Sequence, residues 1–113
     1  MPTERRELEG RILEWVRNRH PELSDQIDQL EIRSYNYTGA GAYINFMALP
    51  THLARVGLKN PLSGPNIRSS HLEYGACSLI WSNGGLINCI EVAAYGDRFP
   101  EELTEFALEE GVA

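Results

Sequence analysis

The residues that could do chemistry gather in one short stretch, IEVAAYGDR at positions 90–98. Glu91 stands between apolar residues of a predicted strand, where burial could raise the pKa of its carboxyl group and suit it to general acid or base catalysis. It could equally face solvent, or accept hydrogen bonds from backbone N–H groups or an arginine. Tyr95 and Asp97 enclose a glycine, a pattern typical of a turn in which Asp97 caps the segment that follows. The stretch therefore supplies candidate binding residues, Glu91, Tyr95 and Asp97, but no catalytic set.

Spacing elsewhere argues against a metal site, a cofactor or an activated nucleophile. His20, His52 and His71 form neither an HExxH nor an HxH pattern, and Cys77 and Cys89 do not form CxxC. No serine occupies a G-x-S-x-G turn, and no glycine-rich loop joins a strand to a helix in the way that a phosphate site requires. We therefore expect no metal and no cofactor, and we expect both cysteines to be reduced thiols.

Aromatic side chains are frequent in the predicted strands, at Tyr35, Tyr37, Tyr43, Tyr74, Trp81 and Tyr95. Several of them should fall on the less buried face of a sheet, with Arg33 and Arg68 nearby. Aromatic and arginine side chains are typical of protein-contact surfaces, although tyrosine is also common in strands for packing reasons alone. Two interpretations stay open: a binding face that includes Tyr35, Tyr43 and Trp81, and ordinary sheet packing.

Charge is spread unevenly along the 113 residues, whose net charge is −6. From Glu91 onward there are seven acidic residues and one basic residue, whereas the preceding 90 residues are balanced. An acidic chain is not expected to bind nucleic acid, because affinity there comes mainly from neutralising phosphates. The acidic end is consistent with solubility alone, or with a contact surface for a basic partner protein.

Length and hydropathy predict residues 1–113 as a single domain. No apolar stretch reaches the length needed to cross a bilayer. The N-terminus, MPTERRELEG, is charged and lacks the apolar core of a secretory signal. We therefore expect a cytoplasmic protein without membrane contact.

The first predicted element is an amphipathic helix over residues 3–19, capped by Thr3. Its apolar stripe has helical spacing and comprises Leu8, Ile12, Trp15 and Val16, with Leu13 as a further candidate. The charged side chains that should lie largely off this stripe are Arg5, Arg6, Glu9 and Glu14. One further helical turn within residues 21–29 would face Leu23 and Ile27 inward.

Strand-like segments that flank glycine turns predict two hairpins. Residues 30–37 and 42–49 flank Thr38-Gly39-Ala40-Gly41, and residues 74–82 and 86–95 flank Asn83-Gly84-Gly85. A two-residue turn at Asn83-Gly84 would pair Glu91 with Ala76. The apolar residues change parity between positions 87 and 90, which indicates either a β-bulge near Asn88-Cys89 or arms covered on both faces.

The remaining segments are a long excursion and a C-terminal helix. Residues 50–68 carry three prolines without a clear period and predict a loop, after which a short strand near 67–73 would re-enter the sheet. Phe99-Pro100 should open a short helix that docks through Leu103, Phe106 and Ala107 and ends at Gly111. The expected fold is α+β. Its antiparallel sheet has four to five strands from two hairpins and packs on the N-terminal amphipathic helix, with a short C-terminal helix.

Two segments, SYNYTGAGAYINF and EYGACSLIWSNGGLINCIEVAAYGDRFPE, together resemble a family of small uncharacterised bacterial proteins. That family has a T-G-x-G hairpin, a later G-A strand, a D/N-G turn, an L/I-E strand, and an end with Tyr-x-Asp/Glu and a proline. The matching residues are Thr38, Gly39, Gly41, Gly75, Ala76, Asn83, Gly84, Ile90, Glu91, Tyr95, Asp97 and Pro100. The chain departs from the pattern at Asn88 and Cys89 in the strand, and in the extra prolines of the excursion. Because the motif consists mostly of turn glycines and apolar strand residues, the resemblance implies a fold more than a chemistry. Some small acidic α+β proteins of this kind are immunity proteins, which block a toxin encoded next door.

The leading hypothesis from the sequence is a non-catalytic protein-binding module of the immunity type. Its basic protein partner would contact the aromatic sheet face or the acidic end. The alternative is a small-ligand protein or enzyme in which Glu91, Tyr95 and His71 line a pocket under the 50–68 loop. A third hypothesis is pairing of an exposed strand edge with a second copy, so both a monomer and a homodimer stay open.

Overall fold

The first helix, α1 (Glu7–Arg19), lies near the start of the part of the chain that the computed structural model describes, residues 5–96 and 98–110. Its predicted stripe is buried except for Trp15, which is half-buried, and Ile12 and Val16 are fully inaccessible. The backbone N–H of Arg6 donates to the carboxylate of Glu9 at 2.9 Å. This bond satisfies one of the amides that a helix start leaves without a partner. The predicted cap, Thr3, lies outside the described residues.

Glu9 corrects one sequence prediction, because its side chain is buried rather than off the stripe. Only 1% of the residue is exposed. Glu9 precedes Ile12 by three residues and Leu13 by four, and residues at these spacings share one side of a helix. The buried side of α1 therefore includes a carboxylate among its apolar residues, and this carboxylate must find partners inside the fold.

The predicted further helical turn is confirmed as η1 (Pro21–Leu23) and α2 (Ser24–Gln29). Leu23 and Ile27 are fully buried. The guanidinium of Arg5 donates to the carbonyl oxygens of Ile27 at 2.6 Å and Leu30 at 3.1 Å. These carbonyls lie at the end of α2, where intrahelical donors run out. Among the described residues, no helix is long and apolar enough to cross a membrane.

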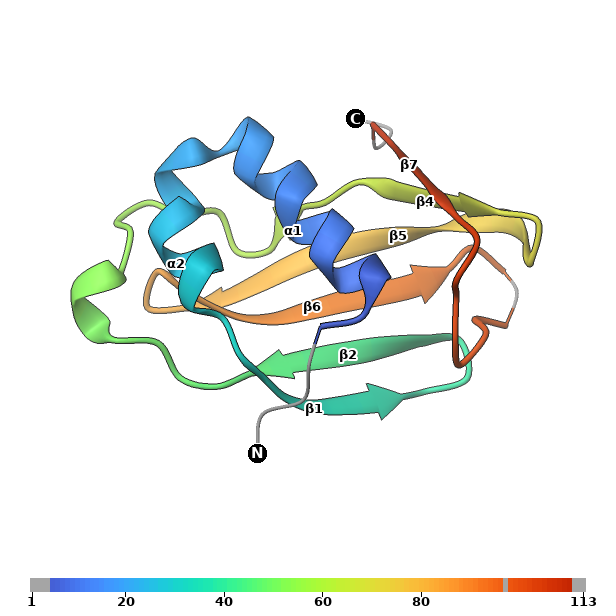
Figure 1. The fold of residues 1–113 in the computed structure, drawn as a ribbon, viewed down its shortest axis with the longest axis horizontal. Helices are drawn as coiled ribbons and strands as arrows, with labels where there is room; N and C mark the ends of the chain where they lie inside the picture. The colour runs from blue at the N-terminus through green and yellow to red at the C-terminus, as the bar shows by residue number, and fades with distance from the viewer. Residues whose placement is uncertain (1–4, 97, 111–113) are drawn as a thin grey trace.

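Both predicted hairpins are confirmed. β1 (Ile32–Tyr37) pairs with β2 (Gly41–Phe46), and β5 (Leu72–Asn83) pairs with β6 (Leu86–Ala94). β2 also pairs with β6, which joins the two hairpins into one antiparallel sheet. β5 and β6 form the centre of that sheet (Figure 1).

The prediction of four to five strands is too low, because the described residues form a sheet of seven. The predicted excursion contains a 3-10 turn, η2 (Thr51–Leu53), and two short strands, β3 (Leu62–Ser63) and β4 (Asn66–Ser69). Both strands pair with β5, and β4 confirms in part the strand predicted near 67–73. The seventh strand, β7 (Ala107–Glu109), pairs with β4. The order across the sheet is β1-β2-β6-β5-β4-β7, with β3 beside β5.

The predicted C-terminal helix is wrong, because β7 occupies residues 107–109 and the described residues from 98 to 106 contain no helix. Leu103 is buried and Phe106 is half-buried, so the segment still docks through apolar side chains. A short helix is only marginally stable in water. β7 instead pairs with the backbone N–H and C=O groups of β4, which would otherwise be an open edge. The predicted helix end at Gly111 lies outside the described residues.

The turn of the second hairpin lies one residue later than predicted. Gly84 and Gly85 have φ values of +60° and +80°, the left-handed pair that a two-residue type I′ turn requires. Gln26 of α2, which is 1% exposed, holds this turn. Its Nε2 donates to the carbonyl oxygens of Gly85 and Leu53, each at 2.9 Å, and its Oε1 accepts from the backbone N–H of Ile87 at 2.8 Å. Helix α2 thereby fixes where the hairpin reverses.

A β-bulge at Asn88 explains why the apolar residues of this strand change faces between positions 87 and 90, one of the two explanations that the sequence left open. Ser82 pairs with Ile87, but Trp81 pairs with Cys89, so Asn88 is an extra residue in β6. Glu91 faces Leu79, not Ala76, the partner expected for a turn at Asn83-Gly84. Without the extra residue, Glu91 would face Ser78, whose side chain is buried on the helix side. The bulge therefore moves Glu91 to the opposite face of the sheet.

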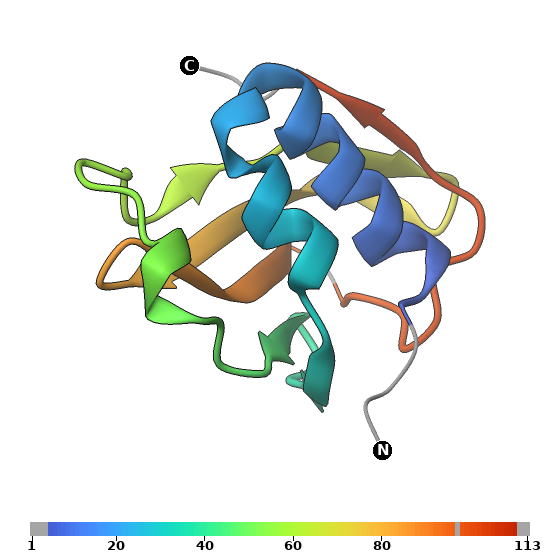
Figure 2. The same cartoon turned by 60° about the vertical axis from the view of Figure 1, so that its left-hand side comes forward.

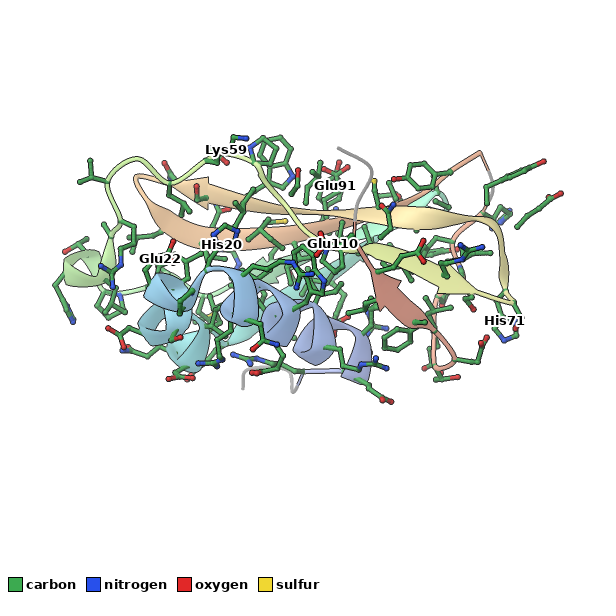
Figure 3. All side chains as sticks on the ribbon, turned by 90° about the horizontal axis from the view of Figure 1, so that it is seen from above. His20, Glu22, Lys59, His71, Glu91 and Glu110 are labelled. Carbon is green, nitrogen blue, oxygen red and sulfur yellow. The ribbon has the colours of Figure 1, made fainter. Side chains whose placement is uncertain are left out.

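The two faces of the sheet are covered unequally. α1 and α2 lie on one face, and the fully buried core residues there include Ile80 and Ile90 (Figure 2). No helix of the described residues lies on the other face, which we call the open face. Seen along the sheet, the helices are on one side and Glu91 is on the other (Figure 3).

Candidate functional site

The open face brings together three of the residues that the sequence singled out. Tyr43 of β2 is the cross-strand partner of Glu91 in β6, and Leu79 of β5 is the partner of Glu91 on its other side. Trp81 lies two residues from Leu79 along β5, so its side chain points to the same face. We call Tyr43, Trp81 and Glu91 the Glu91 cluster.

The side chains of the Glu91 cluster are hydrogen-bonded to one another. The indole Nε1–H of Trp81 donates to Oε1 of Glu91 at 3.0 Å, and the hydroxyl of Tyr43 donates to Oε2 at 3.3 Å. Tyr43 is 37% exposed, whereas Trp81 and Glu91 are half-buried. Two aromatic rings therefore flank a carboxylate that is held in place on the open face, where no helix of the described residues lies.

The charge of Glu91 affects the groups around it. It raises the pKa of the Tyr43 hydroxyl, mainly through charge repulsion of the tyrosinate form. Burial raises the pKa of the Cys89 thiol to about 11, and repulsion by Glu91 adds to this effect. Cys89 is therefore a protonated thiol at neutral pH, which is a poor nucleophile and a poor metal ligand. Both Cys89 and Cys77 are free, as predicted.

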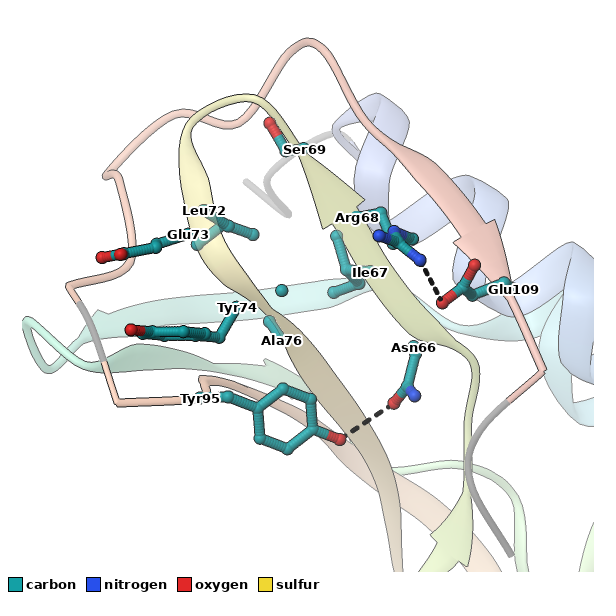
Figure 4. Close-up of a pocket in the computed structure, with 11 residues that line it drawn as sticks. Asn66, Ile67, Arg68, Ser69, Leu72, Glu73, Tyr74, Ala76, Tyr95 and Glu109 are labelled. Carbon is teal, nitrogen blue, oxygen red and sulfur yellow. Dashed lines mark hydrogen bonds and ion pairs between the residues drawn. The ribbon is translucent and has the colours of Figure 1, made fainter.

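Tyr95 lies beyond the end of β6, next to Cys77 at the far end of the open face. Its hydroxyl donates to Oδ1 of Asn66 at 3.0 Å. Tyr95 lines a hollow of about 320 Å³ between β4 and β5, together with Tyr74 and with Arg68, which pairs with Glu109 (Figure 4). The Arg68–Glu109 pair is 3.5 Å long and exposed, so its contribution to stability is small.

Tyr35 faces the helices, not the open face. Its hydroxyl donates to Oε2 of Glu9 at 2.6 Å, and the guanidinium of Arg6 lies 3.9 Å from the centre of its ring. The Arg6 Nε is 3.5 Å from the same Glu9 oxygen. Burial, followed by the hydrogen bond to Glu9 and then by the charge of Glu9, raises the pKa of Tyr35 to about 12. We call Arg6, Glu9 and Tyr35 the Glu9 cluster.

The remaining candidate, Asp97, lies outside the described residues. The pocket expected from Glu91, Tyr95 and His71 is not assembled, because His71 is at the tip of the β4–β5 connection, far from Glu91 (Figure 3). Within the described residues, no three His, Cys, Asp or Glu side chains are arranged to hold a metal ion.

A cleft of about 410 Å³ lies next to the Glu91 cluster, at the end of the sheet where β5 and β6 are joined. Arg33, Asn45 and Cys89 line it, with Phe46 and Leu49 as apolar wall. Glu91 lines neither this cleft nor the hollow beside Tyr95. The first residues of the 50–68 excursion do reach the cleft, through Thr51.

Sequence reasoning missed several residues that complete these surfaces. Leu79, Cys89 and Asn45 share the open face with Glu91, and this follows from strand alternation once the bulge at Asn88 is placed. Glu9 could have been found from its helical spacing to Ile12. Comparison of the chain with known protein families, with curated proteins and with solved structures finds no match. Function is therefore inferred from the geometry of the open face.

Proposed function

We propose that the protein is a non-catalytic protein-binding module that contacts its partner through the open face. The observation that carries this proposal is the Glu91 cluster, two aromatic side chains and a carboxylate on a sheet face that no helix of the described residues covers. Tyrosine and tryptophan supply much of the binding energy of protein interfaces, because they combine a large apolar surface with a polar tip.

The arrangement supports binding better than catalysis. Both oxygens of Glu91 accept hydrogen bonds from side chains of the cluster. A general acid or base works best beside a cavity that excludes water around a substrate, and Glu91 is in the wall of neither neighbouring hollow. The thiol closest in sequence, Cys89, is held in its protonated form.

The acidic C-terminal segment supports a partner contact less well than the open face does. Glu105 accepts hydrogen bonds from Ser69 and Ser70, Glu109 pairs with Arg68, and Glu110 pairs with Arg19. These carboxylates are used to attach the segment to the rest of the fold. The basic partner of an immunity-type role in the bacterial cytoplasm would then approach the open face.

The test is capture of a partner from an extract of the source cells by wild type and by two surface variants. The first variant combines Tyr43→Ser with Trp81→Ser, and the matched control is Tyr74→Ser. Tyr74 is 64% exposed and lies at the other end of the sheet. We expect one protein, identified by mass spectrometry, to be retained by wild type and by the control and lost from the double variant. Equal retention by the double variant, or no retained protein at low salt, would reject the proposal.

A second candidate function, binding of a small molecule, is favoured by the 410 Å³ cleft alone. Its volume is within the range of small-molecule sites, and it combines apolar walls with the cation of Arg33. A panel of carboxylate-bearing metabolites, screened by thermal shift against wild type and Arg33→Gln, tests it. Stabilisation of wild type that the variant loses would support this function.

A further inference from the structure

The Glu91 cluster repeats part of the Glu9 cluster, but without its cation. In the Glu9 cluster, a tyrosine hydroxyl donates to the carboxylate at 2.6 Å and Arg6 contacts both, at 3.9 Å from the tyrosine ring and 3.5 Å from Glu9. In the Glu91 cluster, the hydroxyl of Tyr43 donates to the carboxylate at 3.3 Å. The ion pairs found among the described residues involve Arg6, Arg17, Arg19, His20 and Arg68, and none of them includes Glu91.

Glu91 has capacity left for a cation. An ionised carboxylate offers about four acceptor positions, and Trp81 and Tyr43 use one on each oxygen. A half-buried carboxylate without a positive partner is less stable than one that is paired, since burial removes part of its hydration. A cation that arrives with a binding partner would recover this energy at the interface.

We propose, resting on the binding role argued above, that Glu91 receives an arginine side chain of the partner protein between Tyr43 and Trp81. A guanidinium is planar, so it can donate two parallel hydrogen bonds to a carboxylate and still stack on an aromatic ring. Stacking on tryptophan or tyrosine adds cation–π attraction. The net charge of −6 favours the approach of a basic partner.

Arginine is the better fit than lysine for a reason found in the same molecule. Arg6 stacks on Tyr35 while its Nε faces Glu9, and Arg19 stacks on Trp15 at 3.8 Å from the ring centre. Both rings are therefore covered by a guanidinium supplied by the chain itself. The rings of Tyr43 and Trp81 have no such cover among the described cation–ring contacts.

The probe is the short peptide acetyl-glycyl-arginyl-glycinamide, titrated into the ¹⁵N-labelled full chain. Its matched control is the citrulline peptide, which has the same shape without the charge. The chain has two indole N–H signals, from Trp15 and Trp81. We expect the Trp81 signal to shift saturably with the arginine peptide, with a Kd on the order of millimolar, while the Trp15 signal does not move. The lysine peptide should bind more weakly.

Two variants locate the cation. Glu91→Gln keeps the shape of the side chain and should weaken the arginine peptide at least about fivefold. Glu73→Gln, which removes an exposed acid elsewhere on β5, should not. Equal shifts with arginine and citrulline peptides in wild type, or equal weakening by the two variants, would overturn the proposal. The wild-type titration needs no variant, so the proposal stays testable even if Glu91→Gln folds poorly.

The outcomes separate this proposal from the proposed function. If the peptide shows no preference for arginine but the Tyr43→Ser, Trp81→Ser variant still loses its captured partner, protein binding stands and the arginine contact fails. If the peptide binds at Glu91 while capture of the partner survives the double variant, the cation site stands and the partner uses another surface.

Discussion

Two tyrosine–glutamate pairs lie on opposite faces of one sheet, and only one of them is complete. Glu9 is 1% exposed and is contacted by the Tyr35 hydroxyl, the Arg6 backbone N–H and the Arg6 guanidinium. Glu91 is half-buried and is contacted by Tyr43 and Trp81, and none of the ion pairs found among the described residues includes it. The inner pair lies at the start of α1, which supplies Glu9 and is directly preceded by Arg6, whereas no helix of the described residues covers the outer pair. The same two residue types thus stabilise the fold on one face and remain available for a partner on the other.

The largest effect should come from removal of the inner carboxylate. Glu9→Ala leaves the Tyr35 hydroxyl and the Arg6 N–H without their acceptor and Arg6 without its counter-charge. Loss of one partner from a buried charged network costs about 3 kcal/mol. The measurement is the free energy of unfolding in urea. Glu14→Ala, which removes an exposed acid from the same helix, should cost less than about 0.5 kcal/mol. Equal costs at positions 9 and 14 would contradict the role of the Glu9 cluster.

Removal of the tyrosine hydroxyl should lower the free energy of unfolding more in the inner pair than in the outer pair. Tyr35→Phe deletes a 2.6 Å hydrogen bond to a buried carboxylate and should lower the free energy of unfolding by about 2 kcal/mol. Tyr43→Phe deletes a 3.3 Å bond on the open face, where water can replace the hydroxyl, and should leave the free energy of unfolding nearly unchanged. Urea unfolding of the two variants side by side checks the difference. Similar losses would mean that the open face is covered more than we describe.

Alkaline pH should lower the stability of the fold, because it ionises Tyr35 of the inner pair. Burial and then Glu9 raise the pKa of Tyr35 from its ordinary value of 10.0 to about 12 in the folded chain. Because the folded pKa lies above the unfolded one, Tyr35 contributes stability that is complete below pH 10 and is lost as the pH rises from 10 towards 12. Urea unfolding at about pH 9 and about pH 11 measures this loss. Tyr35→Phe should remove most of it, and an unchanged loss in that variant would show that other groups cause it.

Most helices and strands could be predicted from the sequence, but which strands pair with one another could be predicted less well. Glycine turns, strand alternation and the stripe of α1 are local signals, so both hairpins and the first helix were found. The parity change that marked the bulge at Asn88 is also local. β7 could not be found in this way, because it forms only where the edge of β4, which is distant in sequence, is open. The segment after Pro100 has weak intrinsic helix stability, and the sheet edge decides its conformation.

The residues of the candidate site could likewise be predicted from the sequence, but the contacts between them could not. Residue types pointed to Tyr43, Trp81 and Glu91, but not to their contact, which depends on the register of three strands. Residue type makes Tyr35 a candidate both for a binding face and for ordinary sheet packing, and its cross-strand partner, Ile44, decides between them. Cross-strand partners share a face, and Ile44 is buried, so Tyr35 turns inward. A shift of one residue in either hairpin would have exchanged these roles.

The smallest predicted effect is on the reactivity of the Cys89 thiol. It measures how strongly the charge of Glu91 acts on its neighbours on the open face. Burial is the main reason that the pKa of the Cys89 thiol rises to about 11, and the charge of Glu91 adds to it. Glu91→Gln removes only the second cause, so the pKa of Cys89 should fall slightly while the thiol stays mostly protonated. Alkylation of Cys89 at mildly alkaline pH, followed by mass spectrometry of its peptide, should become about twofold faster. Glu73→Gln should leave the rate unchanged. An unchanged rate in Glu91→Gln would mean that water screens the carboxylate fully, and an arginine of the partner would then gain little by approaching it.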